Sequence, residues 1–259
     1  MRIALVSLDQ KWEDKEANQD RCAYFSKRVE KEFNDVDLII YPEMTLTGFS
    51  VNNPRLAECE EESPTMKFFQ DLAKSTGMSH AGGMIIKRDD RRLYNRCFFI
   101  DKRGIVSGTY DKMHTFSFAG ESDSFDRGGS LCSINGEGAR FGLSICFDLR
   151  FSNLYASYSD TCEVVLNIAN WPAARKTHWL ALLKARAIEN QYFMIGVNRV
   201  GIDGIGAIYD RTSEIFDPLG EKCRPFYEER ELSVYDLDIP LVNQTRAQFP
   251  FLKDRREIL

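Results

Sequence analysis

The sequence predicts a single layered α/β domain over residues 1–259, and three observations favour this fold class. Short apolar runs typical of buried strands alternate with segments whose apolar residues recur every three or four positions, as on amphipathic helices. No Ser-, Gly- or Pro-rich linker and no run of like charge divides the chain. A chain of 259 residues is also long enough to bury a full hydrophobic core. Residues from about 239 onward are expected to form a tail that extends from this core.

The first half of the chain is predicted to run strand, helix, strand and helix, followed by a meander of strands. The helix at 18–33 is predicted from an apolar stripe formed by Cys22, Phe25, Val29 and Phe33. Ser63 and Pro64 open the next helix, because Ser is a favoured N-cap and Pro fits the first helical position. In chain order, the expected elements are strand 2–8, helix 18–33, strand 37–41, the helix from 63, strands 80–87, 94–101 and 105–110 with a polar turn at 88–91, and a loop at 112–129.

The second half repeats the alternation of strands and helices. A turn at Asn135-Gly136 is expected to join its first two strands. In chain order, the expected elements are strands 130–134 and 140–145, a short helix near 153–158, strand 163–168, helix 176–190, strand 192–198, and strands 213–216 and 232–237 separated by a turn at 217–220.

Four of these strands lead into polar residues of kinds that catalysis uses. They lead to Glu43, Lys112, Cys146 and Asn170. The carboxyl ends of strands are where α/β sheets bind ligands, because the loops there vary while the sheet holds them rigidly. A single Cys at a strand end is most often a core residue, and a single Glu or Lys is most often a surface charge. Four such endings together indicate a constellation.

The chemistry of these groups is coherent. The thiol of Cys146 becomes a strong nucleophile when a base such as Glu43 removes its proton. Lys112 and the backbone N–H of Phe147 are suited to stabilise the negative oxygen of a tetrahedral intermediate. A thioester would form and would then be hydrolysed by water activated by the same carboxylate. The pattern predicts hydrolysis of an amide or related carbon–nitrogen bond, with no cofactor and no metal.

Three segments of the chain resemble motifs of the nitrilase (carbon–nitrogen hydrolase) superfamily. They are Tyr41-Pro42-Glu43-Met44 with Thr47-Gly48-Phe49, Tyr110-Asp111-Lys112-Met113-His114, and Ile145-Cys146-Phe147-Asp148-Leu149-Arg150-Phe151. The resemblance extends from residue 2 to about 238 and implies a four-layer αββα sandwich that forms a homodimer. It also implies that Glu121, in Phe118-Ala119-Gly120-Glu121, orients the lysine and assists proton transfer.

The stretch from Asn170 to Arg175, with Ala185–Asn190 beyond it, is similar to the bacterial ω-amidase-like branch of this superfamily. That branch removes the amide of 2-oxoglutaramate and 2-oxosuccinamate and releases ammonia. Such small-molecule substrates carry a carboxylate, so a cationic clamp is expected in the pocket. The candidates for this clamp are Arg175, Arg150 and Arg199, while Trp171 is either a pocket wall or a core residue. Asn170 and Phe147 are further candidates for substrate contacts.

Composition excludes several other classes of protein. A net charge of −5 argues against a nucleic-acid partner, and no apolar run approaches the ~18 residues of a membrane helix. The seven cysteines are odd in number and form no C-x-x-C pair, which argues against a disulfide framework or a zinc ribbon. The N-terminus has no signal-peptide pattern. We therefore expect a cytoplasmic protein with reduced thiols.

Three alternatives to the ω-amidase hypothesis stay open at this point. The first is a Cys146–His114 dyad, because His114 lies two residues beyond Lys112. The second is another amidase of the same superfamily, such as an N-carbamoyl amino acid hydrolase. The third is a non-catalytic scaffold that keeps the fold, because fold alone does not specify activity. The glycines of residues 201–206 have the wrong order for a nucleotide-binding loop, and a β-turn explains them.

Overall fold

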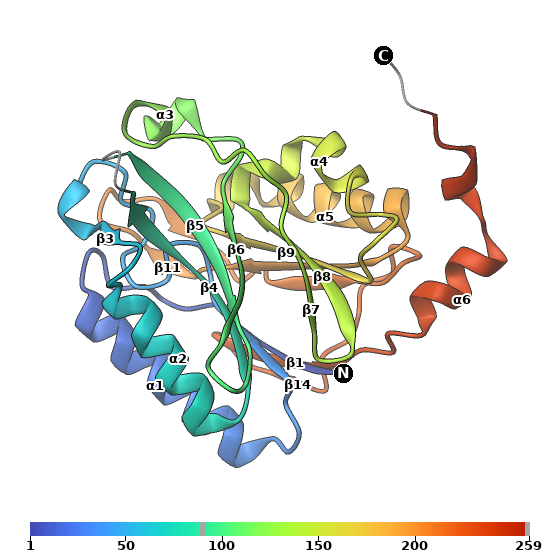
Figure 1. Ribbon diagram of the computed structural model, residues 1–259, viewed down its shortest axis with the longest axis horizontal. Helices are drawn as coiled ribbons and strands as arrows, with labels where there is room; N and C mark the ends of the chain where they lie inside the picture. The colour runs from blue at the N-terminus through green and yellow to red at the C-terminus, as the bar shows by residue number, and fades with distance from the viewer. Residues whose placement is uncertain (89–91, 257–259) are drawn as a thin grey trace.

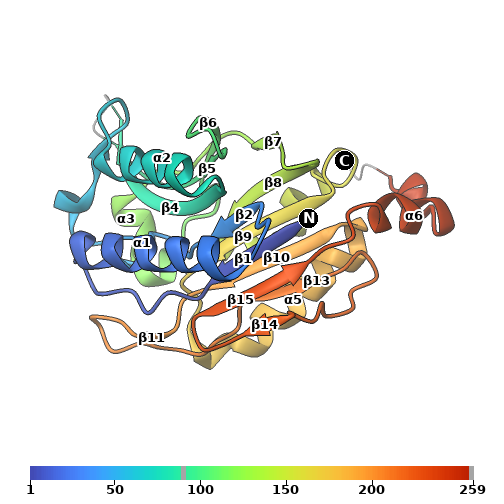
Figure 2. The same ribbon diagram turned by 90° about the horizontal axis from the view of Figure 1, so that it is seen from below.

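Two β-sheets face each other and carry helices on their outer sides (Figure 1). The structure is a computed structural model, and it describes residues 1–88 and 92–256. The larger sheet has the strand order β14-β15-β1-β2-β4-β5-β6, with β3 added beside β4. The smaller sheet has the order β13-β10-β9-β8-β7. Helices α1 and α2 cover the larger sheet, while α4 and α5 lie on the smaller one, so the predicted αββα sandwich is confirmed (Figures 1 and 2).

The strands of the larger sheet are β1 (Arg2–Val6), β2 (Leu38–Ile40), β3 (Glu58–Cys59), β4 (Ser79–Lys87), β5 (Leu93–Ile100), β6 (Val106–Asp111), β14 (Tyr227–Glu228) and β15 (Leu232–Asp236). Those of the smaller sheet are β7 (Ser133–Gly136), β8 (Ala139–Ile145), β9 (Val164–Ala169), β10 (Phe193–Asn198) and β13 (Glu214–Phe216), and β11 (Gly201–Ile202) pairs with β12 (Ile208–Tyr209). The α-helices are α1 (Lys15–Glu32), α2 (Pro64–Thr76), α3 (Glu121–Ser124), α4 (Ser152–Ala156), α5 (Lys176–Asn190) and α6 (Leu241–Gln248).

Strand β1 shows how the sequence specifies the layers. Its side chains alternate between the two faces of the sheet, as in any β-strand. Ile3 and Leu5 pack in the core between the two sheets, whereas Ala4 and Val6 pack under the outer helices. All four side chains are fully buried, which explains why the strand is a continuous apolar run.

The two sheets share one plan, as the repeated alternation of elements predicted. In each sheet three neighbouring strands run parallel, β1-β2-β4 in one and β8-β9-β10 in the other. Antiparallel strands flank both sets. Within each set, the carboxyl ends of the parallel strands therefore meet at a common edge, and the polar residues that follow them are brought together.

Several predicted elements needed correction. The turn between β7 and β8 is Glu137-Gly138, not Asn135-Gly136, because Ile134 pairs with Phe141 and both side chains fill the core between the sheets. The predicted loop at 112–129 contains the short helix α3. The predicted polar turn at 88–91 lies mostly outside the described residues.

The C-terminal segment projects from the sandwich, and α6 lies within it (Figures 1 and 2). The segment is nevertheless anchored, because Val242 is fully buried and Arg246 donates hydrogen bonds to the carbonyl oxygens of Cys162 and Gln191. The expected tail is thus partly helical and docked along its first turns.

Candidate active site

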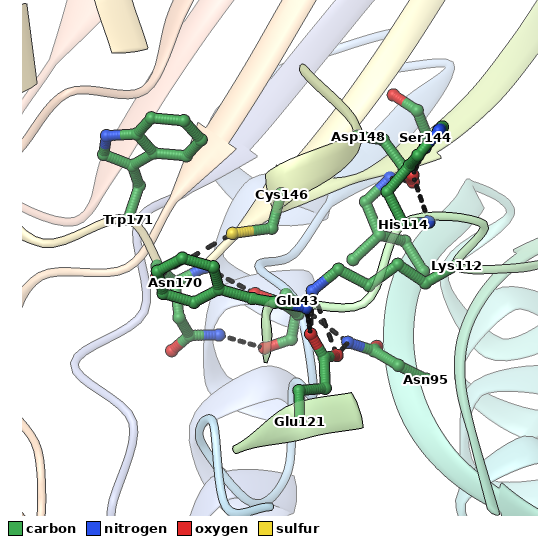
Figure 3. Close-up of polar contacts among 12 residues, drawn as sticks. Glu43, Asn95, Lys112, His114, Glu121, Ser144, Cys146, Asp148, Asn170 and Trp171 are labelled. Carbon is green, nitrogen blue, oxygen red and sulfur yellow. Dashed lines mark hydrogen bonds and ion pairs between the residues drawn. The ribbon is translucent and has the colours of Figure 1, made fainter. Parts of the chain in front are cut away.

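The turns that follow the strands bring the predicted catalytic residues together (Figure 3). Glu43 lies in the turn after β2, Lys112 directly follows β6, and Cys146 opens a 3₁₀ helix (Cys146–Arg150) directly after β8. Glu121 is the first residue of α3, and Asn170 directly follows β9. The larger sheet therefore supplies the base candidate and the lysine, and the smaller sheet supplies the thiol.

Lys112 is the centre of a buried ionic network. Its Nζ donates hydrogen bonds to Glu43 Oε1 at 2.9 Å and to both carboxylate oxygens of Glu121 at 3.0 and 2.9 Å. All three side chains have zero exposure. Burial alone lowers the pKa of Lys112, but the carboxylates of Glu121 and Glu43 outweigh it and raise this pKa above its usual value. The amine is therefore a fixed ammonium group.

Glu43 is held by donors from both sheets. Asn95, near the start of β5, donates through Nδ2 to Glu43 Oε1 at 2.7 Å and to Glu121 Oε1 at 2.8 Å. The backbone N–H of Asn170 donates to Glu43 Oε2 at 2.9 Å. Gly83 of β4 packs so closely that a Cβ there would lie 2.5 Å from the backbone nitrogen of Met44, next to Glu43. The position of this carboxylate is therefore fixed from several directions.

Cys146 adopts a conformation that non-glycine residues rarely occupy. Its φ angle is +46°, and its relative exposure is 8%, so the thiol reaches the surface of a cavity from an otherwise buried turn. Sγ donates to the carbonyl oxygen of Asn170 at 4.0 Å. Burial and the charge of Glu43 raise the pKa of Cys146, and Lys112 only partly offsets them. The resting sulfur is therefore a neutral thiol that needs a base.

A cavity of about 350 Å³ lies above this network. Cys146 and all five predicted substrate contacts line it: Phe147, Arg150, Asn170, Trp171 and Arg175. The remaining lining residues are mostly apolar: Phe49, Phe116, Phe118, Ala119, Pro172, Ile205, Ala207 and Tyr209. Trp171 lines the cavity and is also nearly buried, at 3% exposure. The side chain of Asn170 binds the backbone oxygen of Glu43 at 2.7 Å, which makes it a support for the turn as well as a wall.

Two of the three candidate clamp residues lie in the cavity wall. The guanidinium of Arg150 lies over the ring of Trp171 at 4.9 Å, and that of Arg175 lies over Phe116 at 5.5 Å. Among residues 1–88 and 92–256, neither Arg150 nor Arg175 forms a salt bridge with a carboxylate. Burial and the nearby charge of Arg175 lower the pKa of Arg150. A negative group placed between these cations would be attracted to both.

Arg199 does not belong to this wall. It is fully buried and donates to the backbone oxygens of Val200 and Gln10 at 3.2 and 3.1 Å. His114, the partner of Cys146 in the alternative dyad, makes its contacts elsewhere. Its Nδ1 bonds to Asp148 Oδ1 at 2.8 Å, and its ring stacks on Phe151. Cys146 Sγ donates its hydrogen bond to the carbonyl oxygen of Asn170 and not to this histidine.

Neither Asn95 nor the cavity wall formed by the β11–β12 hairpin was predicted from the sequence. Asn95 and Arg96 are adjacent polar residues in an otherwise apolar, buried strand, and this interruption was the available signal. The hairpin contains the glycines of 201–206, where the predicted turn is confirmed. Asp203 shapes it by accepting hydrogen bonds from the N–H groups of Ile205 and Ala207 and from the hydroxyl of Tyr209.

Comparison with known proteins identifies the family. The family model described as carbon-nitrogen hydrolase matches residues 2–247. The chain belongs to the carbon-nitrogen hydrolase family. It is 31% identical to "Omega-amidase YafV" of Yersinia enterocolitica over 100% of this chain and 98% of that protein. It is 30% identical to "2-oxoglutaramate amidase" of Paenarthrobacter nicotinovorans over 98% of this chain and 90% of that protein.

A solved structure of this family is also similar along the whole chain. The CN-hydrolase superfamily protein XC1258 from Xanthomonas campestris has a TM-score of 0.91 and 30% identity, and the match covers 100% of this chain and 98% of that one. Its crystals contained an arsenic adduct in the active site. As a carbon-nitrogen hydrolase, this protein is an enzyme that hydrolyses carbon–nitrogen bonds other than peptide bonds.

Two kinds of feature are absent from the described part of the chain. No helix there is long and apolar enough to cross a membrane. No group of three or more His, Cys, Asp or Glu side chains in the same residues is arranged to hold a metal ion.

Proposed function

We propose that this hydrolase removes the terminal amide of a small carboxylate-bearing substrate of the 2-oxoglutaramate or 2-oxosuccinamate type, through a thioester on Cys146. The observation that carries the proposal is the buried Glu43–Lys112–Glu121 network beneath a cavity lined by Cys146 and two arginines without carboxylate partners in the described structure. The names of the ω-amidase and 2-oxoglutaramate amidase relatives support the substrate class.

The reaction begins with proton transfer from the Cys146 thiol to Glu43. Oε2 of Glu43 accepts a hydrogen bond from the backbone N–H of Asn170 and has a further lone pair for this proton. Sγ attacks the amide carbon, and the resulting oxyanion is stabilised by Lys112 and by the backbone N–H of Phe147. When the C–N bond breaks, Glu43 returns its proton to the nitrogen and ammonia leaves. A thioester remains on the enzyme.

Water completes the cycle. Glu43 takes a proton from a water molecule, which attacks the thioester carbon, and the C–S bond breaks with return of a proton to Sγ. The balanced reaction is amide plus water to carboxylate plus ammonium. Glu121 keeps Lys112 oriented and charged throughout.

The substrate's carboxylate is proposed to bind Arg150 and Arg175. Their guanidinium groups are held by aromatic rings, which leaves N–H donors available for an anion. A cavity of about 350 Å³ suits a small organic ligand. No residue of the described structure would need to be displaced from a salt bridge with either arginine.

Ammonia release from a substrate panel tests the proposal. The panel contains 2-oxoglutaramate, 2-oxosuccinamate, glutamine, N-carbamoyl amino acids and simple nitriles, and we expect the two 2-oxo acid amides to have the highest kcat/KM. Preference for N-carbamoyl amino acids would favour the rival amidase class. Absence of turnover on every compound, with no faster alkylation of Cys146 than of the exposed Cys59, would favour a non-catalytic scaffold.

Two substitutions of the nucleophile test the thioester. Cys146→Ala is expected to abolish ammonia release while the protein stays folded. Cys146→Ser is expected to be nearly inactive, because a carboxylate base is too weak to activate a hydroxyl. Full ammonia release by the alanine variant would contradict the mechanism.

The same proposal includes a cytoplasmic homodimer. All seven cysteines are unpaired, which supports a reducing compartment. Ile188 on the outer face of α5 is 47% exposed and is one of the apolar side chains available to a second copy. Light scattering of the purified protein tests the dimer, and a monomeric mass at micromolar concentration would contradict it.

A further inference from the structure

The relative position of Lys112 and Cys146 must be fixed by something that joins their two turns. Lys112 follows a strand of the larger sheet and Cys146 follows a strand of the smaller sheet, so neither turn sets the geometry alone. A loss of about 1 Å in such alignment can cost ~10²-fold in rate. One buried carboxylate lies between the two turns, and the mechanism described above does not use it.

That carboxylate is Asp148, which is fully buried and accepts hydrogen bonds at both oxygens. Oδ1 accepts from the backbone N–H of His114 at 2.9 Å and from its ring Nδ1 at 2.8 Å. Oδ2 accepts from the hydroxyl of Tyr110 at 2.8 Å and from the backbone N–H of Ile145 at 3.0 Å. Figure 3 shows Asp148 beside His114, and a dashed line marks the contact between their side chains.

The residues that donate these hydrogen bonds lie next to Lys112 and Cys146 in the sequence. Tyr110 and His114 flank Lys112, two residues to either side. Ile145 directly precedes Cys146, and Asp148 itself lies two residues after it. The Tyr110 hydroxyl also accepts a hydrogen bond from the backbone N–H of Met113 at 3.2 Å. A single carboxylate thus holds both turns, each next to its reactive residue.

We infer that Asp148 is a positioning residue that sets the distance between the Lys112 ammonium and the Cys146 sulfur, and that His114 and Tyr110 act through it. The strained φ of +46° at Cys146 fits this role, because such a conformation persists only when the surroundings hold it. Only a carboxylate can accept all four hydrogen bonds, since an amide would turn an NH₂ group toward at least one N–H or O–H donor. The inference rests on the proposed roles of Lys112 and Cys146.

The main test is Asp148→Asn, which keeps the shape of the side chain. We expect kcat to fall about 10²-fold while KM changes less than about threefold. This kcat is calculated per active site, and active sites are counted by alkylation of Cys146. His114→Phe keeps the stacking on Phe151, and Tyr110→Phe keeps the buried ring, so each removes one hydrogen bond. Each is expected to lower kcat about three- to tenfold. These two variants decide the question if Asp148→Asn does not fold.

Tyr192→Phe is the matched control. Tyr192 is equally buried in the same core, and its hydroxyl contacts the backbone oxygen of Tyr155 at 3.4 Å, away from both turns. We expect this variant to keep the wild-type kcat per site even when its stability falls. Equal kcat values for Tyr110→Phe, His114→Phe and Tyr192→Phe would overturn the inference.

A second readout separates this inference from the proposed function. The pH profile of Cys146 alkylation by iodoacetamide needs no amide substrate. Because Lys112 favours the thiolate of Cys146, a displaced lysine should move the midpoint of the profile in Asp148→Asn upward by at least about half a pH unit. If wild-type enzyme hydrolyses no panel compound but the midpoint still moves, the proposed function fails and the positioning role stands. If Asp148→Asn leaves both the midpoint of the alkylation profile and kcat unchanged, the positioning role of Asp148 is overturned.

Discussion

The two sheets contribute to the site in different ways. The larger sheet supplies Glu43 and Lys112, which are fully buried and held by several short hydrogen bonds. The smaller sheet supplies Cys146, whose sulfur makes one long contact of 4.0 Å and whose backbone is strained. In the proposed mechanism, the charges that stabilise the reaction are therefore fixed before substrate binds, whereas the sulfur that attacks it lies on the cavity wall. Rigidity is concentrated where charge develops, as electrostatic preorganisation requires.

The largest effect is expected from removing the charge on the larger sheet. Lys112→Met leaves Glu43 and Glu121 as unpaired buried carboxylates, so we expect a loss of about 3–5 kcal/mol in the free energy of unfolding. Acylation in single-turnover experiments should fall about 10³-fold, because an oxyanion donor is lost. Urea unfolding and rapid-quench assays measure the two effects.

Two controls sharpen this prediction. Lys112→Met combined with Glu121→Gln should recover part of the stability but none of the activity, because one unpaired charge is gone while the donor is still missing. Lys67→Met removes an exposed lysine on α2 that pairs with Asp71 at 3.2 Å, and it should change stability by less than about 0.5 kcal/mol. Wild-type acylation by Lys112→Met would remove the lysine from the mechanism.

The larger sheet is also expected to be the acid-sensitive part of the fold. His80 in β4 is fully buried against Ser26 of α1, and burial lowers the pKa of His80 to about 4, from 6.5 in an unfolded chain. Below pH 6.5 the unfolded chain binds a proton that the folded chain excludes, so stability present above pH 6.5 is lost as pH falls toward 4. The expected loss is about 3 kcal/mol at pH 4.

His80→Gln should flatten this part of the stability curve. Urea unfolding between pH 7 and pH 4 measures the difference between variant and wild type, in which the contributions of the carboxylates cancel. His178→Gln, at an exposed position on α5, is the control and should keep the wild-type slope. Parallel curves for His80→Gln and wild type would show that this histidine does not carry the acid sensitivity.

On the side of the smaller sheet, we expect effects on binding rather than on stability. Arg150→Met and Arg175→Met should each raise KM for a 2-oxo acid amide about 10- to 100-fold with little change in the free energy of unfolding. Alkylation provides an internal control, because iodoacetate carries a carboxylate and iodoacetamide does not. The ratio of the two rates at Cys146 should fall in both variants, and an unchanged ratio would exclude an anion site at these arginines.

The smallest expected effect isolates the strain at the nucleophile. Cys146→Gly and Cys146→Ala both lack the thiol, but glycine adopts a positive φ without strain. We expect the glycine variant to be more stable than the alanine variant by about 1 kcal/mol. At Cys162, which has no positive φ, glycine should be the less stable of the same pair. Equal stabilities of the two Cys146 variants would mean that this turn stores no strain.

The sequence predicted those parts of the site that are written in local motifs. Glu43, Lys112 and Cys146 each follow a strand within a short, recognisable segment. The structure joins Lys112 and Glu43 in an ion pair and places Cys146 in the wall of the adjoining cavity. Asn95 was missed because its two partners lie 52 and 26 residues away, and only the pairing of strands brings them together. Local sequence does not encode that register.

The same reason accounts for the errors in the fold. Both Asn135-Gly136 and Glu137-Gly138 are suitable turn sequences, and the choice depends on which residues reach the facing sheet. Short strands such as β3 and β14, of two residues each, have no periodicity to detect. Helix α6, of eight residues, lies in the segment that was expected to form an extended tail.

The hydrogen bond from Asn170 to Glu43 joins residues 127 positions apart, and this separation has a consequence for folding. A chain in which only the larger sheet is ordered has Glu43 and Lys112 in place, but the thiol of Cys146 is not yet aligned with them. Contacts of such long range form late, because the intervening loop must first be closed. Recovery of catalysis during refolding should therefore lag behind recovery of secondary structure and report the moment at which the two sheets dock.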